Sequence, residues 1–155
     1  PADILWDVGA GTGSVSVELA LAAPKGHVYA VECDPDACAL IRQNRAKFQT
    51  YNLTLIEGRA PDALADLPAP DAVFIGGTKG GMEAVLDEVL GKNPNARICI
   101  SAIALETLGA AIAALTARGL TAEVTQIAVS RTKPAGRLHL LMANNPIFLI
   151  TGTRK

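Results

Sequence analysis

Residues 5–20 read LWDVGAGTGSVSVELA and place three glycines, at positions 9, 11 and 13, between an apolar run and a segment of helical character. A strand, a glycine-rich turn and a helix follow one another in this order where an open α/β sheet binds a ligand. Glycine lets the main chain turn sharply, and it lets another group approach the backbone closely. The stretch therefore predicts a strand, a ligand-binding loop and a helix.

The spacing of these glycines differs from that of a dinucleotide-binding loop. Here it is G-x-G-x-G, whereas the dinucleotide fingerprint, G-x-G-x-x-G, has its third glycine one place later. Asp7 lies just before the loop, and a carboxylate is a poor neighbour for a pyrophosphate at a helix N-terminus. A cationic or zwitterionic ligand suits the loop better, and an NAD site is disfavoured.

Short β-rich runs alternate with segments of helical period along most of the chain. The strand candidates are residues 4–8, 27–33, 53–58, 71–77 and 96–103, followed by 120–129 and 146–152. Apolar strands separated by helices predict a parallel sheet covered on both faces. No convincing helix joins the last two strands, so the late strand is expected to be antiparallel, and residues 138–142 (LHLLM) fit a strand, a helical turn or a flap. We predict a doubly wound, Rossmann-like α/β fold with a mostly parallel seven-stranded sheet.

The composition of the chain fits one such domain and narrows its partners. The 155 residues are 50% hydrophobic, which is enough for a sizeable core. A net charge of −1 and an aromatic content of 4% disfavour a nucleic-acid partner, which needs a basic surface or stacking platforms. No apolar run approaches a membrane span, and Cys33, Cys38 and Cys99 form no C-x-x-C pair. We expect a cytoplasmic protein with buried thiols, no membrane partner and no metal site.

The ends of the second and third strands supply further ligand-binding candidates. Glu32 follows the glycine loop by roughly 20 residues, where a carboxylate can accept hydrogen bonds from both hydroxyls of a ribose. Glu32, Arg59 and Ala60 at these strand ends fit a nucleoside with an amino-acid or thioether tail and no phosphates. S-adenosylmethionine is such a ligand. The predicted cofactor-binding residues are Asp7, Gly9, Ala10, Gly11, Thr12, Gly13, Glu32, Arg59, Ala60 and Gly76.

At these residues the chain resembles the class I S-adenosylmethionine-dependent methyltransferases. More narrowly, the segments LWDVGAGTGSVSVE, AVECDP, EGRAPDAL, DAVFIGG and NPIFLITG resemble the decarboxylating precorrin methyltransferases of cobalamin biosynthesis. The resemblance implies methylation of carbon 15 of a tetrapyrrole, with loss of carbon dioxide from the acetate of ring C. It also implies that the backbone of residues 9–13 faces the methionine tail, that Glu32 holds the ribose, and that the backbone of Arg59 and Ala60 borders the adenine.

The same resemblance also implies how the domain is assembled and to what it is joined. Members of the family tend to form homo-oligomers, and in some organisms the unit is fused to an N-terminal tetrapyrrole methylase domain. We therefore expect residues 1–155 to be a single methyltransferase domain, as the C-terminal domain or a fragment of a longer protein.

A precorrin is broad and edged with carboxylates, so its site needs an open floor and fixed cations. Glycines around Lys79 can provide the floor, and guanidinium groups suit acetate and propionate side chains. The predicted substrate-binding residues are Gly77, Lys79, Arg131, Lys133 and Arg137, although an ordinary solvated loop would also explain the cations. No catalytic side chain is assigned, because methyl transfer to carbon mainly needs positioning. The proton donor for decarboxylation stays open among His139, Ser101, Glu106 and Thr107.

Two other functions stay open. Another class I methyltransferase, acting on transfer RNA or on isoaspartyl residues of proteins, is one alternative, because loops rather than the fold select the substrate. A non-catalytic binding module that retains the fold is the other. Cofactor titration followed by methyl-transfer assays separates all three.

Overall fold

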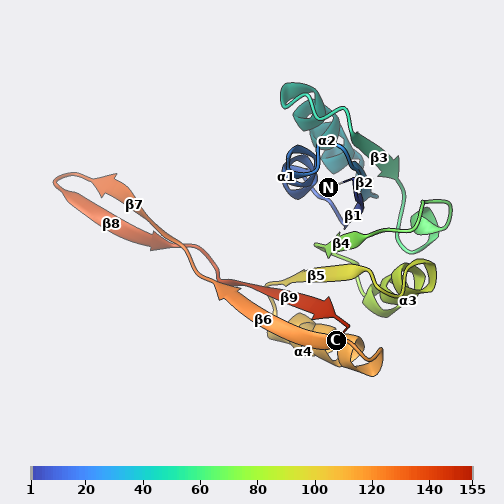
Figure 1. Cartoon of the computed structure of the whole chain (residues 1–155). Coiled ribbons are helices and arrows are strands. Elements are labelled where there is room, and N and C mark those ends of the chain that lie inside the picture. Colours follow the sequence, from blue (N-terminus) through green and yellow to red (C-terminus); the bar gives the residue numbers. More distant parts are fainter. Residues whose placement is uncertain (1, 155) are drawn as a thin grey trace.

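A seven-stranded sheet with strand order β3-β2-β1-β4-β5-β9-β6 forms the centre of the computed structural model, which describes residues 2–154 (Figure 1). Its strands are β1 (Ile4–Val8), β2 (His27–Glu32), β3 (Leu53–Glu57), β4 (Ala72–Ile75), β5 (Arg97–Ala102), β6 (Thr121–Ile127) and β9 (Ile147–Thr153). The first five strands pair in parallel, and β9 lies between β5 and β6, antiparallel to both. The predicted fold class and the antiparallel late strand are confirmed.

The strand order reverses beside β1, which has β2 on one side and β4 on the other. Val8 is in register with Val31 of β2 and with Ile75 of β4, so the three strands end at the same edge of the sheet. Ligands of open α/β sheets bind in the crevice outside this edge, at the point where the order reverses. The glycine loop therefore lies where a ligand site is expected.

Within residues 2–154, four helices cover the sheet: α1 (Ser14–Ala22), α2 (Pro35–Lys47), α3 (Met82–Lys92) and α4 (Leu105–Ala117), with a short 3-10 turn, η1 (Asp62–Leu64). Leu5 packs in one hydrophobic core with residues of α1 and α2, whereas Trp6 packs in another with residues of α3 and α4. Because successive strand residues point to opposite faces, the two cores lie on opposite faces of the sheet.

A cap fixes the start of α2, directly after the end of β2. Asp34 is the N-cap, and its side chain accepts hydrogen bonds from the backbone N–H groups of Asp36 and Ala37. Pro35 occupies the first helical position, where its missing N–H costs no hydrogen bond. The cap thereby sets the direction of the chain that leaves Glu32.

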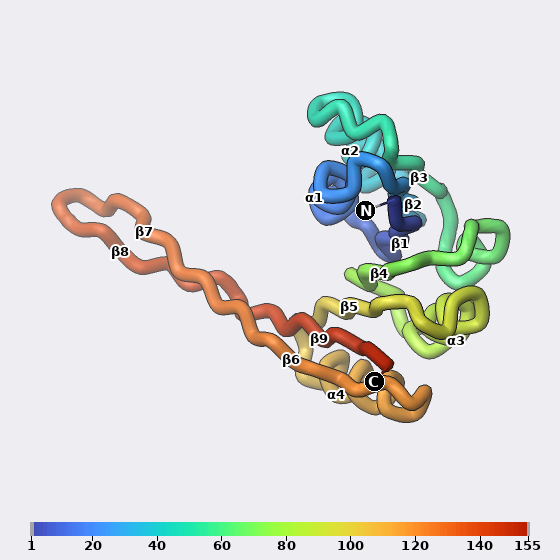
Figure 2. Tube along the Cα trace, viewed as in Figure 1, coloured from blue at the N-terminus to red at the C-terminus, as the bar shows by residue number. Residues whose placement is uncertain are grey.

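The segment between β6 and β9 forms a hairpin of its own. Strands β7 (Ser130–Ala135) and β8 (Leu138–Ala143) pair only with each other within the described part of the chain, as a two-stranded antiparallel sheet. Figure 2 shows the hairpin extending away from the rest of the domain, and every residue of both strands is exposed. Of the three structures that residues 138–142 fitted by sequence, the strand is the one found. Across residues 2–154, no helix has the length and apolar character needed to cross a membrane.

Candidate functional site

The three glycines of the loop differ in what a side chain would meet at each position. A Cβ added at Gly9 would lie 2.1 Å from the carbonyl oxygen of Gly77, so Gly9 permits close packing of the backbone that follows β4. A Cβ at Gly13 would lie 2.9 Å from Cγ1 of Ile41, so Gly13 permits the approach of α2. A Cβ at Gly11 would meet no atom within 4 Å. Gly11 is therefore the glycine of the loop that faces open space.

The carboxylate of Glu32 is fixed by main-chain donors on both of its oxygens. Oε2 accepts a hydrogen bond of 2.8 Å from the N–H of Gly11, while Oε1 accepts from Cys33 N (2.8 Å) and Asp34 N (2.9 Å). Burial by itself raises the pKa of Glu32, but these three donors outweigh it and hold the pKa below its usual value. Each carboxylate oxygen can accept two hydrogen bonds, so Oε2 keeps room for a ligand hydroxyl.

A crevice of about 140 Å³ opens beside this carboxylate. The ends of four strands line it, with Val8 and Gly9 at the end of β1, residues 31–33 at the end of β2, residues 58–60 after β3 and residues 77–79 after β4. Among the predicted cofactor-binding residues, Gly9, Glu32, Arg59 and Ala60 belong to this lining. Ala10, Gly11, Thr12 and Gly13 continue the loop beside it, whereas Asp7 and Gly76 lie outside the lining.

Asp7 lies beneath the loop, with 1% of its surface exposed. Its Oδ2 accepts a hydrogen bond from the hydroxyl of Ser16 in α1, while Oδ1 accepts none from the described residues. Burial raises the pKa of Asp7 to about 6, although the Ser16 hydrogen bonds lower it; the charge of Glu32 adds a smaller increase. The Asp7–Ser16 pair connects the strand before the glycine loop to the helix after it.

Cys33 lies in the crevice rather than in the core. The sequence places its thiol in an apolar run, but β2 ends at Glu32, so Cys33 falls in the turn before α2 and is exposed. The expectation of a buried thiol is wrong at this position, whereas Cys38 is buried and Cys99 is half-buried. The ammonium Nζ of Lys79 lies 3.7 Å from the Cys33 sulfur, so the two side chains meet across the crevice.

A second, larger hollow of about 500 Å³ adjoins the crevice. It lies between the turn after β4, the start of α3, the end of β5 and the first turns of α4, and residues 77–79 line both hollows. Gly77 and Lys79, two predicted substrate-binding residues, are among these shared residues. Gly76 and the proton-donor candidates Ser101, Glu106 and Thr107 also line the second hollow, whereas His139 lies on the β7–β8 hairpin.

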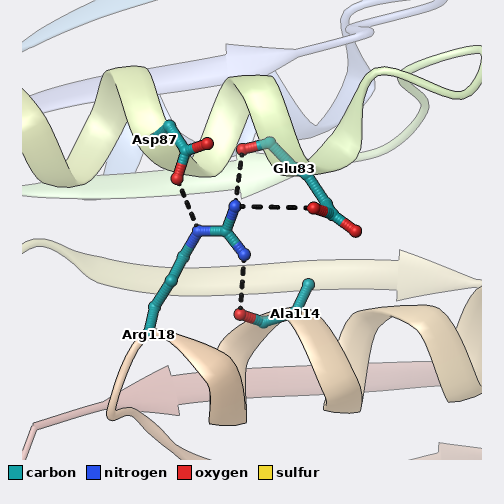
Figure 3. A network of polar contacts seen from close by, with 4 residues as sticks. All are labelled: Glu83, Asp87, Ala114 and Arg118. Carbon is teal, nitrogen blue, oxygen red and sulfur yellow. Dashed lines mark hydrogen bonds and ion pairs between the residues drawn. The ribbon is translucent and has the colours of Figure 1, made fainter.

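Arg118 joins the two helices that border the second hollow (Figure 3). Its Nε donates to Asp87 Oδ1 at 2.7 Å, and its terminal nitrogens donate to the carbonyl oxygens of Ala114 (2.9 Å) and Glu83 (3.2 Å). The hydrogen bond to Asp87 raises the pKa of Arg118, and the same bond lowers the pKa of Asp87. Sequence reasoning missed Arg118, because nothing local shows that the end of α4 reaches α3.

The remaining predicted substrate-binding residues, Arg131, Lys133 and Arg137, lie on the hairpin and the turn that joins its strands. All three are exposed and line neither hollow. Within this chain, the structure does not bring them together with Gly77 and Lys79, because the hairpin projects away from the sheet (Figure 1).

Comparison with known proteins connects this geometry to one family. Residues 1–154 match the family model described as a precorrin methyltransferase domain. A protein of Pyrobaculum calidifontis, named probable cobalt-precorrin-6B C(15)-methyltransferase (decarboxylating), is 43% identical over 152 residues, which cover 96% of this chain and 77% of that protein. A Sinorhizobium protein, named precorrin-6Y C(5,15)-methyltransferase [decarboxylating], is 44% identical over 88 residues, which cover 55% of this chain and 21% of that protein.

A solved structure agrees with these sequence matches. The crystal structure of precorrin-6Y C5,15-methyltransferase from Geobacter metallireducens superposes with a TM-score of 0.94 at 37% sequence identity, over 99% of this chain and 80% of that one. The family that the glycine loop and the later motifs resemble is thus confirmed over nearly the whole chain. This protein belongs to the family of precorrin methyltransferase domains.

Proposed function

We propose that the protein transfers a methyl group from S-adenosylmethionine to carbon 15 of a precorrin tetrapyrrole and removes carbon dioxide from the acetate side chain of ring C, in cobalamin biosynthesis. The observation that carries the proposal is the Glu32 carboxylate, held charged beside Gly11 at the crevice where the strand order reverses. The names of relatives at 43% and 44% identity support the choice of reaction and substrate.

The crevice suits the cofactor in its chemistry. Glu32 would accept a hydrogen bond from a ribose hydroxyl, and the backbone of Arg59 and Ala60 would border the adenine. The main chain of residues 9–13 would face the methionine tail, with Gly11 leaving room for it. Asp7 would act from beneath, by holding the loop between β1 and α1. When bound, the sulfonium supplies the methyl group.

The second hollow suits the tetrapyrrole, because it adjoins the crevice through residues 77–79. Gly77 presents no side chain there, and Lys79 supplies a cation for a substrate carboxylate. In the decarboxylation, the bond from the acetate methylene to its carboxylate breaks, carbon dioxide leaves, and the electron pair enters the conjugated macrocycle. A proton then adds to the methylene carbon. Ser101, Glu106 and Thr107 border the space in which that proton must be delivered.

We further propose that the hairpin makes the contact of a homo-oligomer. Four large apolar residues of β8 are exposed, namely Leu138, Leu140, Leu141 and Met142. Exposed apolar groups gathered on one element are typical of association surfaces. Arg131, Lys133 and Arg137 would then meet substrate carboxylates at the site of a neighbouring copy. Replacing Leu138 and Leu141 by serine should reduce the mass measured by light scattering, and neutralising Arg131 and Arg137 should raise the substrate KM without changing cofactor affinity.

We also propose how the protein is organised into domains and where in the cell it works. Residues 1–155 would form one methyltransferase domain of a longer protein, and the Sinorhizobium relative, of which the match spans only 21%, supports a fusion. We propose that the fused part is an N-terminal tetrapyrrole methylase domain. We also propose that the protein works in the cytoplasm, without a nucleic-acid partner.

The test is a methyl-transfer assay with cobalt-precorrin-6B and S-adenosylmethionine. The proposal predicts a tetrapyrrole product that has gained a net CH2, because a methyl group enters and a proton leaves, and that has lost one carbon dioxide, as measured by mass spectrometry. Methylation of transfer RNA or of an isoaspartyl peptide instead would favour another methyltransferase. Cofactor binding without transfer to any of these acceptors would favour a binding module.

A further inference from the structure

Lys79 lies between the cofactor crevice and the second hollow, and it lines both. Its ammonium nitrogen reaches across the crevice to within 3.7 Å of the Cys33 sulfur. Its side chain therefore occupies space beside Glu32 that the proposed cofactor would need.

The turn that carries Lys79 leaves open space beside the lysine. Lys79 has a φ of 48°, in the left-handed region that a residue with a Cβ rarely adopts. Gly77 lies two residues before it and Gly80 directly after it, and a Cβ added at either would meet no atom within 4 Å. Because residues 77–79 line both hollows, the Lys79 side chain can reach the second hollow by rotation about its own bonds, while the backbone of Gly77 stays packed against Gly9.

The size and charge of the crevice show why the lysine would have to move. Its volume of about 140 Å³ is below the roughly 300 to 1,000 Å³ of ligand pockets in general. The sulfonium of S-adenosylmethionine is a cation, and a second cation in the same narrow space repels it. Withdrawal of the Lys79 side chain would remove both obstacles.

The charges of the second hollow show where the ammonium would be useful. The charged residues that line it are Lys79, Glu83 and Glu106, and the Glu83 carboxylate lies 3.9 Å from a terminal nitrogen of Arg118. Lys79 is the one cation among the described residues of this lining, beside two acids. A substrate with several carboxylates therefore depends on Lys79 to bind there.

We infer that Lys79 is a positioning residue shared by the two sites. Binding of the cofactor turns its ammonium out of the crevice and into the second hollow, where it pairs with a carboxylate of the tetrapyrrole. The cofactor then prepares the substrate site, so the two ligands bind with favourable coupling. This inference rests on the proposed function, since it takes S-adenosylmethionine and a tetrapyrrole as the two ligands.

The experiment measures the affinity for S-adenosylmethionine and S-adenosylhomocysteine by calorimetry. The affinity for uroporphyrin, a tetrapyrrole with many carboxylates, is measured by fluorescence. The proteins are wild type, Lys79→Met, Lys79→Arg and a control, Lys25→Met, at an exposed lysine in the turn before β2. Lys79→Met should bind S-adenosylmethionine about threefold more tightly, with a smaller gain for S-adenosylhomocysteine, whose sulfur carries no charge. It should bind uroporphyrin at least about fivefold more weakly. S-adenosylmethionine should raise the affinity of the wild type for uroporphyrin but not that of Lys79→Met. Lys79→Arg should keep uroporphyrin binding, and Lys25→Met should match wild type.

Opposite effects on the two ligands are the signature of a shared lysine. Weaker or unchanged S-adenosylmethionine binding in Lys79→Met overturns the inference, as does unchanged uroporphyrin binding. A wild-type protein that binds neither S-adenosylmethionine nor S-adenosylhomocysteine contradicts the proposed function itself. A wild type that binds both, with Lys79→Met behaving identically, refutes only the role of Lys79.

Discussion

The carboxylate of Glu32 accepts a hydrogen bond of 2.8 Å from the backbone N–H of Gly11, and this bond connects the end of β2 to the loop after β1. The acid proposed to hold the cofactor ribose therefore also holds the loop proposed to face the methionine tail. Loss of Glu32 should disturb both parts of the site at once, which a ribose contact alone would not do.

Replacing Glu32 by alanine should weaken binding of S-adenosylhomocysteine about tenfold or more, because hydrogen bonds to charged groups contribute roughly 1.5–3 kcal/mol. The protein should also lose thermal stability, since three backbone donors lose their acceptor. Because the pKa of Glu32 is lowered on folding, its stabilisation is present above pH 4.5, the ordinary value, and is lost as the pH falls further. Calorimetry and pH-dependent unfolding check both effects. A Glu32→Ala variant that binds the cofactor as tightly as wild type would show that Glu32 does not hold the ribose.

Alanine at Gly9 should destabilise the fold more than alanine at Gly11. Gly9→Ala places a Cβ 2.1 Å from the Gly77 carbonyl oxygen, so backbone must move, at a cost of about 3 kcal/mol or more. Gly11→Ala meets no atom within 4 Å, and its positive φ of 56° alone should cost about 1–2 kcal/mol. Gly11→Ala should therefore fold and yet bind cofactor poorly. Chemical denaturation orders the two variants, and tight cofactor binding by Gly11→Ala would mean that the open space beside Gly11 holds no ligand.

Asp7 should make the stability of the protein fall as the pH rises from about 4 to about 6. Its pKa of about 6 in the folded protein lies above its ordinary value of 3.8, so folding favours the protonated form. The stabilising contribution of Asp7 is then fully present below pH 3.8 and is lost as the pH rises through about 6. The total loss is up to about 3 kcal/mol, and little changes above that pH. Asp7→Asn removes the titrating group, so the difference in unfolding free energy between variant and wild type should follow this pH course. A difference that is flat between pH 4 and pH 7 would show that Asp7 is charged throughout.

Replacing Arg118 by lysine should lower the melting temperature by about 3–6 °C, because an ammonium cannot reproduce a guanidinium that reaches Asp87, Ala114 and Glu83 together. Cofactor affinity should stay unchanged, since Arg118 lies outside the crevice lining. Differential scanning calorimetry and cofactor titration measure the two properties on the same samples. A variant that melts like wild type would show that other contacts hold α3 to α4.

Local patterns predicted the parts of the fold that depend on few residues. The alternation of apolar strands and helices predicted the sheet, and the missing helix before the last strand predicted that this strand is antiparallel. The position of Glu32 one strand away from the glycine loop followed from topology alone. Such features are readable because chain order and periodicity determine which residues share an edge.

The remaining features depend on tertiary contacts that no local pattern encodes. The sequence shows that Gly9 is small, but only the structure shows that the backbone of Gly77 requires it. A strand one residue shorter than expected exposes Cys33, and the projection of the hairpin separates Arg131 from Lys79. The sequence shows that Arg131, Lys133 and Arg137 lie close together, but only the structure shows that their hairpin extends away from the hollows of the same chain.

A crystal structure of the complex with S-adenosylhomocysteine tests the cofactor site most directly. We predict that the ribose hydroxyls lie within hydrogen-bonding distance of the Glu32 carboxylate, with the homocysteine tail along the main chain of residues 9–13. A ligand bound elsewhere on the protein, with Glu32 making contact only with its three backbone donors, would contradict the proposed site and the function derived from it.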